Sequence, residues 1–111
     1  GENISSFEVE AIVSQHPDLT GTAAIGVPSE HGEDEVKIVV TRREGSKLSP
    51  EELINFLIPR MPRFMVPRYI EFVESLPRTP STQNVRKVEL RKDPLNENTW
   101  DREAAGIEIP R

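Results

Sequence analysis

The residues best suited to chemistry lie between Leu76 and Arg91, in the run LPRTPSTQNVRKVELR. Prolines bound a polar loop over residues 77–84, and a short helix is predicted to follow it. Asn84, at the end of the loop, can donate a hydrogen bond but carries no charge. Lys87 follows three residues later, one helical turn away, and could supply the positive charge that Asn84 lacks.

Histidine and acidic residues give little support for a metal site. His16 and His31 have no second histidine or paired carboxylates at ligand spacing, so no zinc site is predicted. The run HGEDE over residues 31–35 is acidic enough for a weak cation site, but a solvated loop is the preferred interpretation. The sequence has no cysteine, no Ser-His-Asp arrangement and no glycine-rich phosphate loop.

The bulk properties set the scale of the molecule. A chain of 111 residues is about one domain, which is small for a deep cleft with walls of its own. A net charge of -5 argues against nucleic acid as the main partner, because phosphate neutralisation needs clustered Lys and Arg. No apolar run approaches the roughly 20 residues that span a bilayer, and no signal peptide is apparent, so a cytoplasmic domain is predicted. The chain opens on Gly1 without methionine, which predicts a piece of something longer.

Local signals divide the chain into helices and strands. A serine followed three residues later by glutamate is typical of a helix start. Alternating apolar residues indicate strands, and prolines end helices because they cannot continue the hydrogen-bond pattern. These signals predict helices over residues 5–16, 49–58 and 85–91, and strands over residues 22–27, 35–42 and 68–74.

The order of these elements predicts an α+β domain. The first two strands are expected to pair as a hairpin, with the second strand mostly buried on one face and Lys37 and Thr41 on the other. We expect a small three-stranded sheet covered by helices. The tail from Lys92 holds the only tryptophan, Trp100, and is predicted to pack back onto the body.

Several motifs, in order, carry a resemblance to the C-terminal domain of the adenylate-forming (acyl-CoA synthetase) superfamily. The run from Leu76 to Arg91 resembles the last core motif of that family, LP-(K/R)-T-x-(T/S)-G-K-(I/V)-x-(K/R)-x-x-L-R. The tail TWDREAAGIE resembles endings in the crotonobetaine/carnitine-CoA ligase-like subgroup. The resemblance spans residues 1–91, and residues 92–111 form a tail. It also rests on four further motifs: GENISSFEVE at the hinge, HPDL, the hairpin AIGVPSEHGEDEVKIVV, and LSPEELINFLIPRMPRFMVPRYIEFVESLPRTP.

The resemblance implies a lid that works with a large N-terminal domain. In this family the lid rotates between one pose for adenylation of a carboxylic acid and another for thioester formation with CoA. Counted back from Leu90 and Arg91, the family's adenylation lysine falls on Asn84 and the preceding glycine on Gln83. Counted forward from Leu76, the loop is one residue longer than the family pattern. The frame of the motif is therefore present, but its cation is not.

The same resemblance implies contacts with substrates. Thr82 and Gln83 belong to the nucleotide loop, and Lys87 is either a substitute cation or a family-typical basic residue. At the hinge, the resemblance implies that Gly1, Glu2 and Asn3 form part of the CoA tunnel; the alternative is a solvated linker. It also implies contacts with the CoA phosphate from Arg42, Arg43 and Lys47; the alternative is a solvated basic turn.

The expected substrates and cofactors are ATP, a carboxylic acid and CoA, with Mg²⁺ bound through the N-terminal adenylation domain. The expected activity is acyl-CoA synthesis through an acyl-adenylate, with the isolated lid inactive. The alternative is a free-standing, non-catalytic interaction module derived from this domain.

Overall fold

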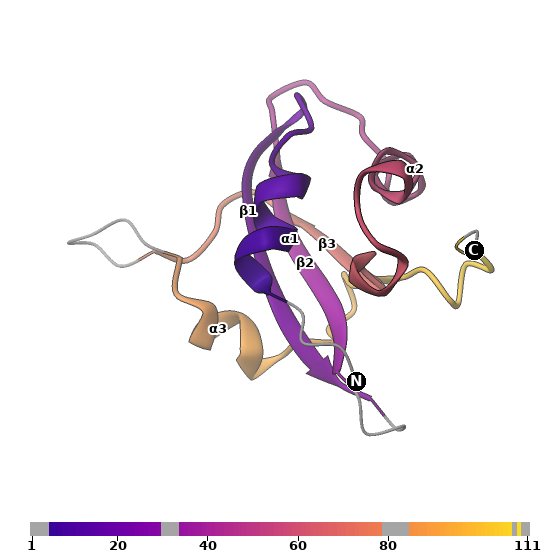
Figure 1. The fold of residues 1–111 in the computed structure, drawn as a ribbon. Helices are drawn as coiled ribbons and strands as arrows, with labels where there is room; N and C mark the ends of the chain where they lie inside the picture. Colours follow the sequence, from indigo (N-terminus) through magenta and orange to yellow (C-terminus); the bar gives the residue numbers. More distant parts are fainter. Residues whose placement is uncertain (1–4, 30–33, 79–84, 108, 110–111) are drawn as a thin grey trace.

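The computed structural model describes residues 5–29, 34–78, 85–107 and 109. Figure 1 shows a twisted sheet with helices on both of its faces, so the predicted α+β class is confirmed. The short helix after the loop begins at Lys87 rather than at Val85. In chain order the elements are α1 (Ser6–Val13), β1 (Leu19–Pro28), β2 (Asp34–Arg42), α2 (Pro50–Leu57), the 3₁₀ turns η1 (Ile58–Arg60) and η2 (Arg63–Met65), β3 (Tyr69–Val73), α3 (Lys87–Lys92) and β4 (Trp100–Asp101).

The strands follow the order β1-β2-β3-β4 in one sheet. β1 and β2 form the predicted antiparallel hairpin, with Ala24 opposite Ile38. β3 runs parallel to β2, with Ile70 beside Ile38, because the crossover through α2 separates these two strands. β4 pairs antiparallel with β3 and places Trp100 opposite Ile70. The prediction of three strands is wrong by one, because β4 has two residues and is too short to show alternation.

Helices α1 and α2 cover one face of the sheet (Figure 1). The predicted apolar stripes of both helices are buried there, with Val9 and Val13 from α1 and Leu53, Ile54 and Leu57 from α2 fully enclosed. Burying each of these side chains contributes about 1.5–3 kcal/mol. This face therefore holds the main hydrophobic core and fixes both helices on the sheet.

Serine side chains cap both helices at the predicted positions. The Ser5 hydroxyl oxygen accepts a hydrogen bond from the backbone N–H of Glu8 at 3.3 Å. The Ser49 hydroxyl oxygen accepts from the N–H of Glu52 at 3.1 Å, and the Glu52 carboxylate accepts in return from the N–H of Ser49 at 3.0 Å. Only α2 thus has the complete capping box among the described residues. α1 ends at Val13, before the proline that was expected to stop it.

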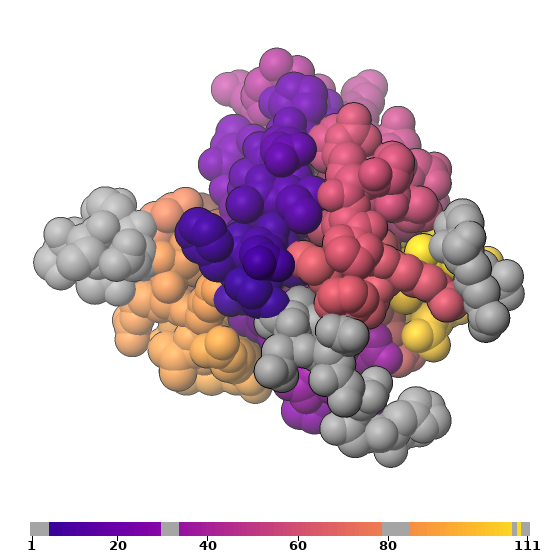
Figure 2. Space-filling view, in the orientation of Figure 1, coloured from indigo at the N-terminus to yellow at the C-terminus, as the bar shows by residue number. Residues whose placement is uncertain are grey.

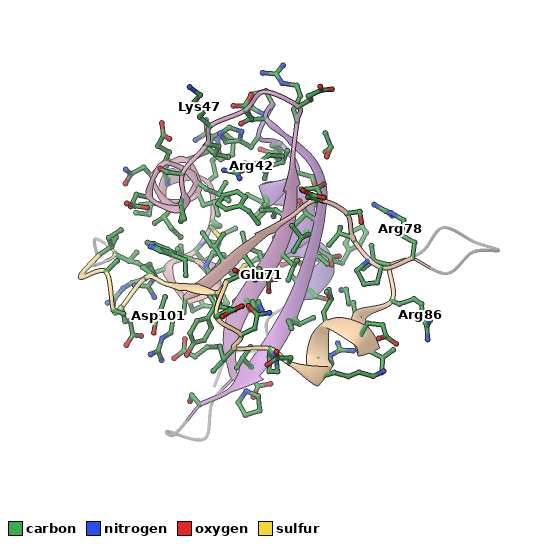
Figure 3. The ribbon with its side chains drawn as sticks, turned by 180° about the vertical axis from the view of Figure 1, so that it is seen from behind. Arg42, Lys47, Glu71, Arg78, Arg86 and Asp101 are labelled. Carbon is green, nitrogen blue, oxygen red and sulfur yellow. The ribbon has the colours of Figure 1, made fainter. Side chains whose placement is uncertain are left out.

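The second face of the sheet is also covered. Leu90 of α3 packs against a cluster of Ala23, Val39 and Leu76. Figure 3, which views the molecule from behind, shows the tail crossing the same face. The face of β2 that carries Lys37, predicted only to lie opposite the mostly buried face, is therefore buried as well: Lys37 is only 1% exposed.

The tail packs back onto the domain through Trp100, Ile107 and Ile109, which are half-buried against the main core. The backbone N–H of Arg102 donates to the carbonyl oxygen of Arg68 at 2.8 Å and extends the contact beyond β4. Within the described ranges, no helix has the length and apolar character needed to cross a membrane.

Candidate functional site

The backbone closes the base of the loop that carries the resemblance to a catalytic motif. Arg78 and Val85 form an isolated antiparallel bridge, and the N–H of Arg86 donates to the carbonyl oxygen of Pro77 at 2.7 Å. Figure 3 shows Arg78 and Arg86 at this base. Both ends of the loop are thus held at one place beside the sheet. The predicted site residues Thr82, Gln83 and Asn84, and the hinge residues Gly1, Glu2 and Asn3, lie outside the described residues.

Lys87, the alternative cation, is engaged with α1. Its ammonium group lies 2.7 Å from a carboxylate oxygen of Glu10 and 3.3 Å from the hydroxyl of Ser6. The same Glu10 oxygen accepts a hydrogen bond from the backbone N–H of Ala24 at 2.9 Å. Lys87 and Glu10 are 24% and 23% exposed, so water only partly screens their attraction. This geometry supports a structural role for Lys87 more directly than a role as substitute cation.

Arg42, Arg43 and Lys47 are brought to one end of the sheet, where Figure 3 shows Arg42 and Lys47. Arg42 stacks over the ring of Phe72 at 4.3 Å and donates to the carbonyl oxygen of Leu48 at 2.9 Å. Arg43 pairs with Asp18 at 2.7 Å. All three predicted basic side chains remain exposed. An open depression of about 270 Å³ lies beside them, lined by Arg42, Arg43, Ser46, Phe72, Val73 and Glu74.

This depression is compatible with a phosphate group but not with a buried ligand. Two guanidinium groups supply donors of the kind that bind phosphate oxygens, whereas the Ser46 hydroxyl already donates to the Asp18 carboxylate at 3.1 Å. Glu74 adds a negative charge to the same rim, and Asp18 already neutralises part of the Arg43 charge. The site therefore fits a solvent-exposed phosphate, held weakly by side chains that keep most of their water.

His16 contributes to a turn instead of a metal site. Its Nδ1 accepts a hydrogen bond from the N–H of Asp18 at 3.0 Å, and its ring lies edge-on to Phe56 at 4.7 Å. In the described part of the chain, no group of three or more histidine, aspartate or glutamate side chains is placed to hold a metal ion. His31 lies outside the described residues.

Sequence reasoning missed a buried polar cluster around Lys37. Its ammonium donates to the Glu71 carboxylate at 2.8 Å, to the Thr99 hydroxyl at 3.2 Å and to the carbonyl oxygen of Pro94. The Asn96 side chain donates to the same Glu71 oxygen at 3.0 Å. Lys37 is 1% exposed and Glu71 12%, so the pair is enclosed between the sheet and the tail. A lysine within the run VKIVV of β2, whose other residues are apolar, and a glutamate within β3 were the available signals.

A second ion pair fastens the tail at the start of β3. The Arg68 guanidinium donates to both carboxylate oxygens of Asp101, at 3.0 and 3.2 Å. Burial by itself raises the pKa of Asp101. The hydrogen bond from Arg68, backbone N–H groups of Glu103 and Ala104, and the Arg68 charge outweigh it and hold the pKa below its ordinary value. Asp101 is therefore charged at neutral pH, and its charge stabilises the docked tail.

We expect the contribution of Asp101 to stability to disappear in acid. Because folding lowers its pKa, its contribution is complete above the unfolded value of 3.8 and is lost as the pH falls through the lower folded value. The Asp101→Asn variant should be less stable than the parent at pH 7, and the gap should narrow below pH 3.8. Urea unfolding of both proteins across this range measures the gap. A gap that stays constant down to pH 2 would contradict the assignment.

Most of the chain matches a known protein family. The sequence profile of the AMP-binding enzyme C-terminal domain matches residues 8–83, well over half of the chain. The chain therefore belongs to the AMP-binding enzyme C-terminal domain family. The resemblance seen in the motifs is confirmed by this match.

Individual relatives agree with this assignment. The chain is 37% identical over 87 residues to a crotonobetaine/carnitine–CoA ligase of Escherichia fergusonii, covering 78% of this chain and 17% of that protein. It is 35% identical over 91 residues to the fatty acid–[acyl-carrier-protein] ligase ScoC of Streptomyces coeruleorubidus, covering 82% and 17%. The crystal structure of ATP-bound MatB from Rhodopseudomonas palustris superposes with a TM-score of 0.77 at 29% identity, covering 83% and 18%. The chain thus spans about a sixth of the relatives it matches.

Proposed function

We propose that this chain is the lid of an acid–thiol ligase, which joins a carboxylic acid to CoA through an acyl-adenylate. The observation that carries the proposal is the family match over residues 8–83, together with the closed loop base at Pro77 and Arg86. The relatives named above are ligases of CoA or of acyl carrier protein and are about five times as long as this chain. The remaining chain of such a protein would supply the acid pocket and the ATP and Mg²⁺ sites.

The reaction has two steps in this proposal. First, a carboxylate oxygen of the acid attacks the α-phosphorus of ATP, and the bond to the β-phosphate breaks to release pyrophosphate. Second, the CoA sulfur attacks the acyl carbon, the bond to AMP breaks, and the thiol proton is lost to solvent. Closure of a lid over the first step protects the acyl-adenylate from water. We expect the isolated 111-residue chain to catalyse neither step, because the acid pocket and the ATP and Mg²⁺ sites would lie in the remaining part of the protein.

Asn84 occupies the loop position where the resemblance places the adenylation lysine. Negative charge accumulates on the α-phosphate and the attacking carboxylate during the first step, and a fixed cation stabilises that transition state. Asn84 can donate a hydrogen bond but supplies no charge. We therefore infer that the first step is slow in the natural protein and that the second step is largely spared.

We assign the basic end of the sheet to the phosphate of CoA. The exposed Arg42 and Lys47 side chains would meet a phosphate through charge-assisted contacts, with Arg43 shared between the phosphate and Asp18. Neutralising Arg42 and Lys47 to glutamine should raise the KM for CoA roughly fivefold, since an exposed pair contributes ~1 kcal/mol.

Two controls make this measurement specific. The KM for ATP should not change, and the effect should vanish with dephospho-CoA, which lacks the 3′-phosphate. Arg60→Gln serves as the matched control, because Arg60 is an exposed arginine that stacks on Phe56 in a different element. An equal loss with CoA and dephospho-CoA would remove the phosphate assignment.

The proposed function is tested with the full-length natural protein. ATP–pyrophosphate exchange should depend on an added carboxylic acid, tested with a panel of short, medium and long acyl chains and of betaine-type acids. AMP release should then increase when CoA is added. A variant of that protein that ends just before Gly1, and so lacks this domain, should lose acid-dependent AMP release. Unchanged AMP release without the lid, or release of ADP in place of AMP, would contradict the proposal.

A further inference from the structure

Glu10 joins three separate elements around the outer edge of β1. β1 ends the sheet, so any backbone N–H that does not face β2 points away from the sheet. The Ala24 N–H is such a group, and the Glu10 carboxylate of α1 accepts its hydrogen bond at 2.9 Å. Lys87, the first residue of α3, reaches the same carboxylate oxygen at 2.7 Å from the other side of the sheet. The carboxylate therefore connects α1, the edge of β1 and α3.

The connection continues directly into the base of the loop. Arg86 precedes Lys87, and its N–H is bonded to the Pro77 carbonyl oxygen at 2.7 Å. Val85, one residue earlier, is bridged to Arg78. Figure 2 shows α1 between the α2 segment and α3 on one side of the molecule, and the ion pair of Lys87 with Glu10 joins α1 to α3. Moving α3 away from α1 would shift both strands of the loop base.

We propose that Lys87 and Glu10 are positioning residues for adenylation, and that together they hold the loop base against α1. This inference rests on the proposed function. Lys87 acts through its ion pair rather than by touching a substrate. To serve as the missing cation, its ammonium would have to leave a Glu10 carboxylate that is only 23% exposed and would then lack its ionic partner.

The two roles of Lys87 make opposite predictions for Glu10. If Lys87 were a substitute cation, Glu10→Gln would release its charge and preserve or increase adenylation. If the pair positions the loop base, Glu10→Gln weakens the hold on α3 and lowers adenylation. The thioester step, which does not use the loop cation, should change little in either variant.

The experiment uses the full-length protein with the acid that gives the highest pyrophosphate exchange. Lys87→Met, Glu10→Gln and their double variant are compared with Lys87→Arg. Lys92→Met is the matched control, because Lys92 pairs with Glu89 within α3 and is 67% exposed. Three quantities are measured: acid-dependent pyrophosphate exchange, thioester formation from supplied acyl-adenylate and CoA, and the urea midpoint.

We expect Lys87→Met and Glu10→Gln each to lower exchange about tenfold, as small misplacements of reacting groups do. The double variant should be no slower than either single variant, because both remove the same contact. Lys87→Arg should retain most of the exchange, and Lys92→Met all of it. Thioester formation should stay within about twofold in every variant, which a general loss of folding would not allow.

Three results would overturn the inference. These are exchange that is unchanged or faster in Glu10→Gln, losses that multiply in the double variant, and equal losses in both half-reactions with a matching fall in the urea midpoint. Acid-dependent exchange that is absent both from the parent protein and from its Asn84→Lys variant is a different result. It rejects the proposed function itself, and the inference falls with it.

Discussion

Replacing Asn84 with lysine in the full-length protein should raise acid-dependent pyrophosphate exchange on the order of 10²–10³-fold. The expected gain equals the effect of one well-placed stabilising group on a transition state that carries developing charge. An asparagine in the same place offers a shorter, neutral donor, so most of that stabilisation is absent. The exchange rate at saturating ATP and acid measures the gain.

The thioester half-reaction provides the control for this substitution. Formation of the thioester from supplied acyl-adenylate and CoA should change little in Asn84→Lys. Asn84→Gln, which lengthens the side chain without adding charge, should leave the exchange near the parent rate. An unchanged exchange rate in Asn84→Lys would show that position 84 is not the position of the family lysine.

Breaking the buried pair of Lys37 and Glu71 should cause a large loss of stability in this domain. Glu71→Met leaves the Lys37 ammonium enclosed without its carboxylate, and removing one partner of a buried pair costs about 3–5 kcal/mol. Because Pro94, Asn96 and Thr99 gather around this pair, the tail should loosen with it. Urea unfolding followed by Trp100 fluorescence reports both effects, since Trp100 is half-buried in the core.

A double variant separates the ion pair from simple packing. Lys37→Met with Glu71→Met places two apolar side chains in the same space, and such replacements are often neutral. We therefore expect the double variant to be more stable than Glu71→Met alone. A double variant that loses the sum of the two single effects would mean that the side chains act independently and that the pair has no special role.

The helices and the hairpin were predictable because local signals and burial agree. The serine caps at Ser5 and Ser49 lie where helices begin, and the apolar residues after them face the core. Alternating residues in β2 identified a strand. For these segments, the signals that predict the element lie within about ten consecutive residues, so the local sequence is enough to identify it.

The covered second face of the sheet was not predictable in the same way. Lys37 is buried because Pro94 and Thr99 approach it from about 60 positions away in the sequence. β4 exists because the tail returns to β3, not because its two residues favour a strand. Long-range packing of this kind leaves no periodic signal in the sequence.

The family was predictable from the sequence, whereas the contacts around the candidate site were not. The motifs identified the family, which the profile match over residues 8–83 confirms. The roles of Arg42, Arg43, Lys47 and Asn84 stay predictions. The ion pair of Lys87 with Glu10 had no sequence signal, since 77 positions separate the two residues and only the folded edge of β1 brings them together.

The mass of the native polypeptide tests the central claim most directly. An antibody raised against this domain should detect, in the source cells, a single band at roughly 55–60 kDa, the size of a protein several domains long. Such a band is the predicted result for a lid that belongs to a complete ligase. A sole band at the 12.6 kDa of the chain itself would contradict the account, because the lid would then exist without the domain that it is proposed to close.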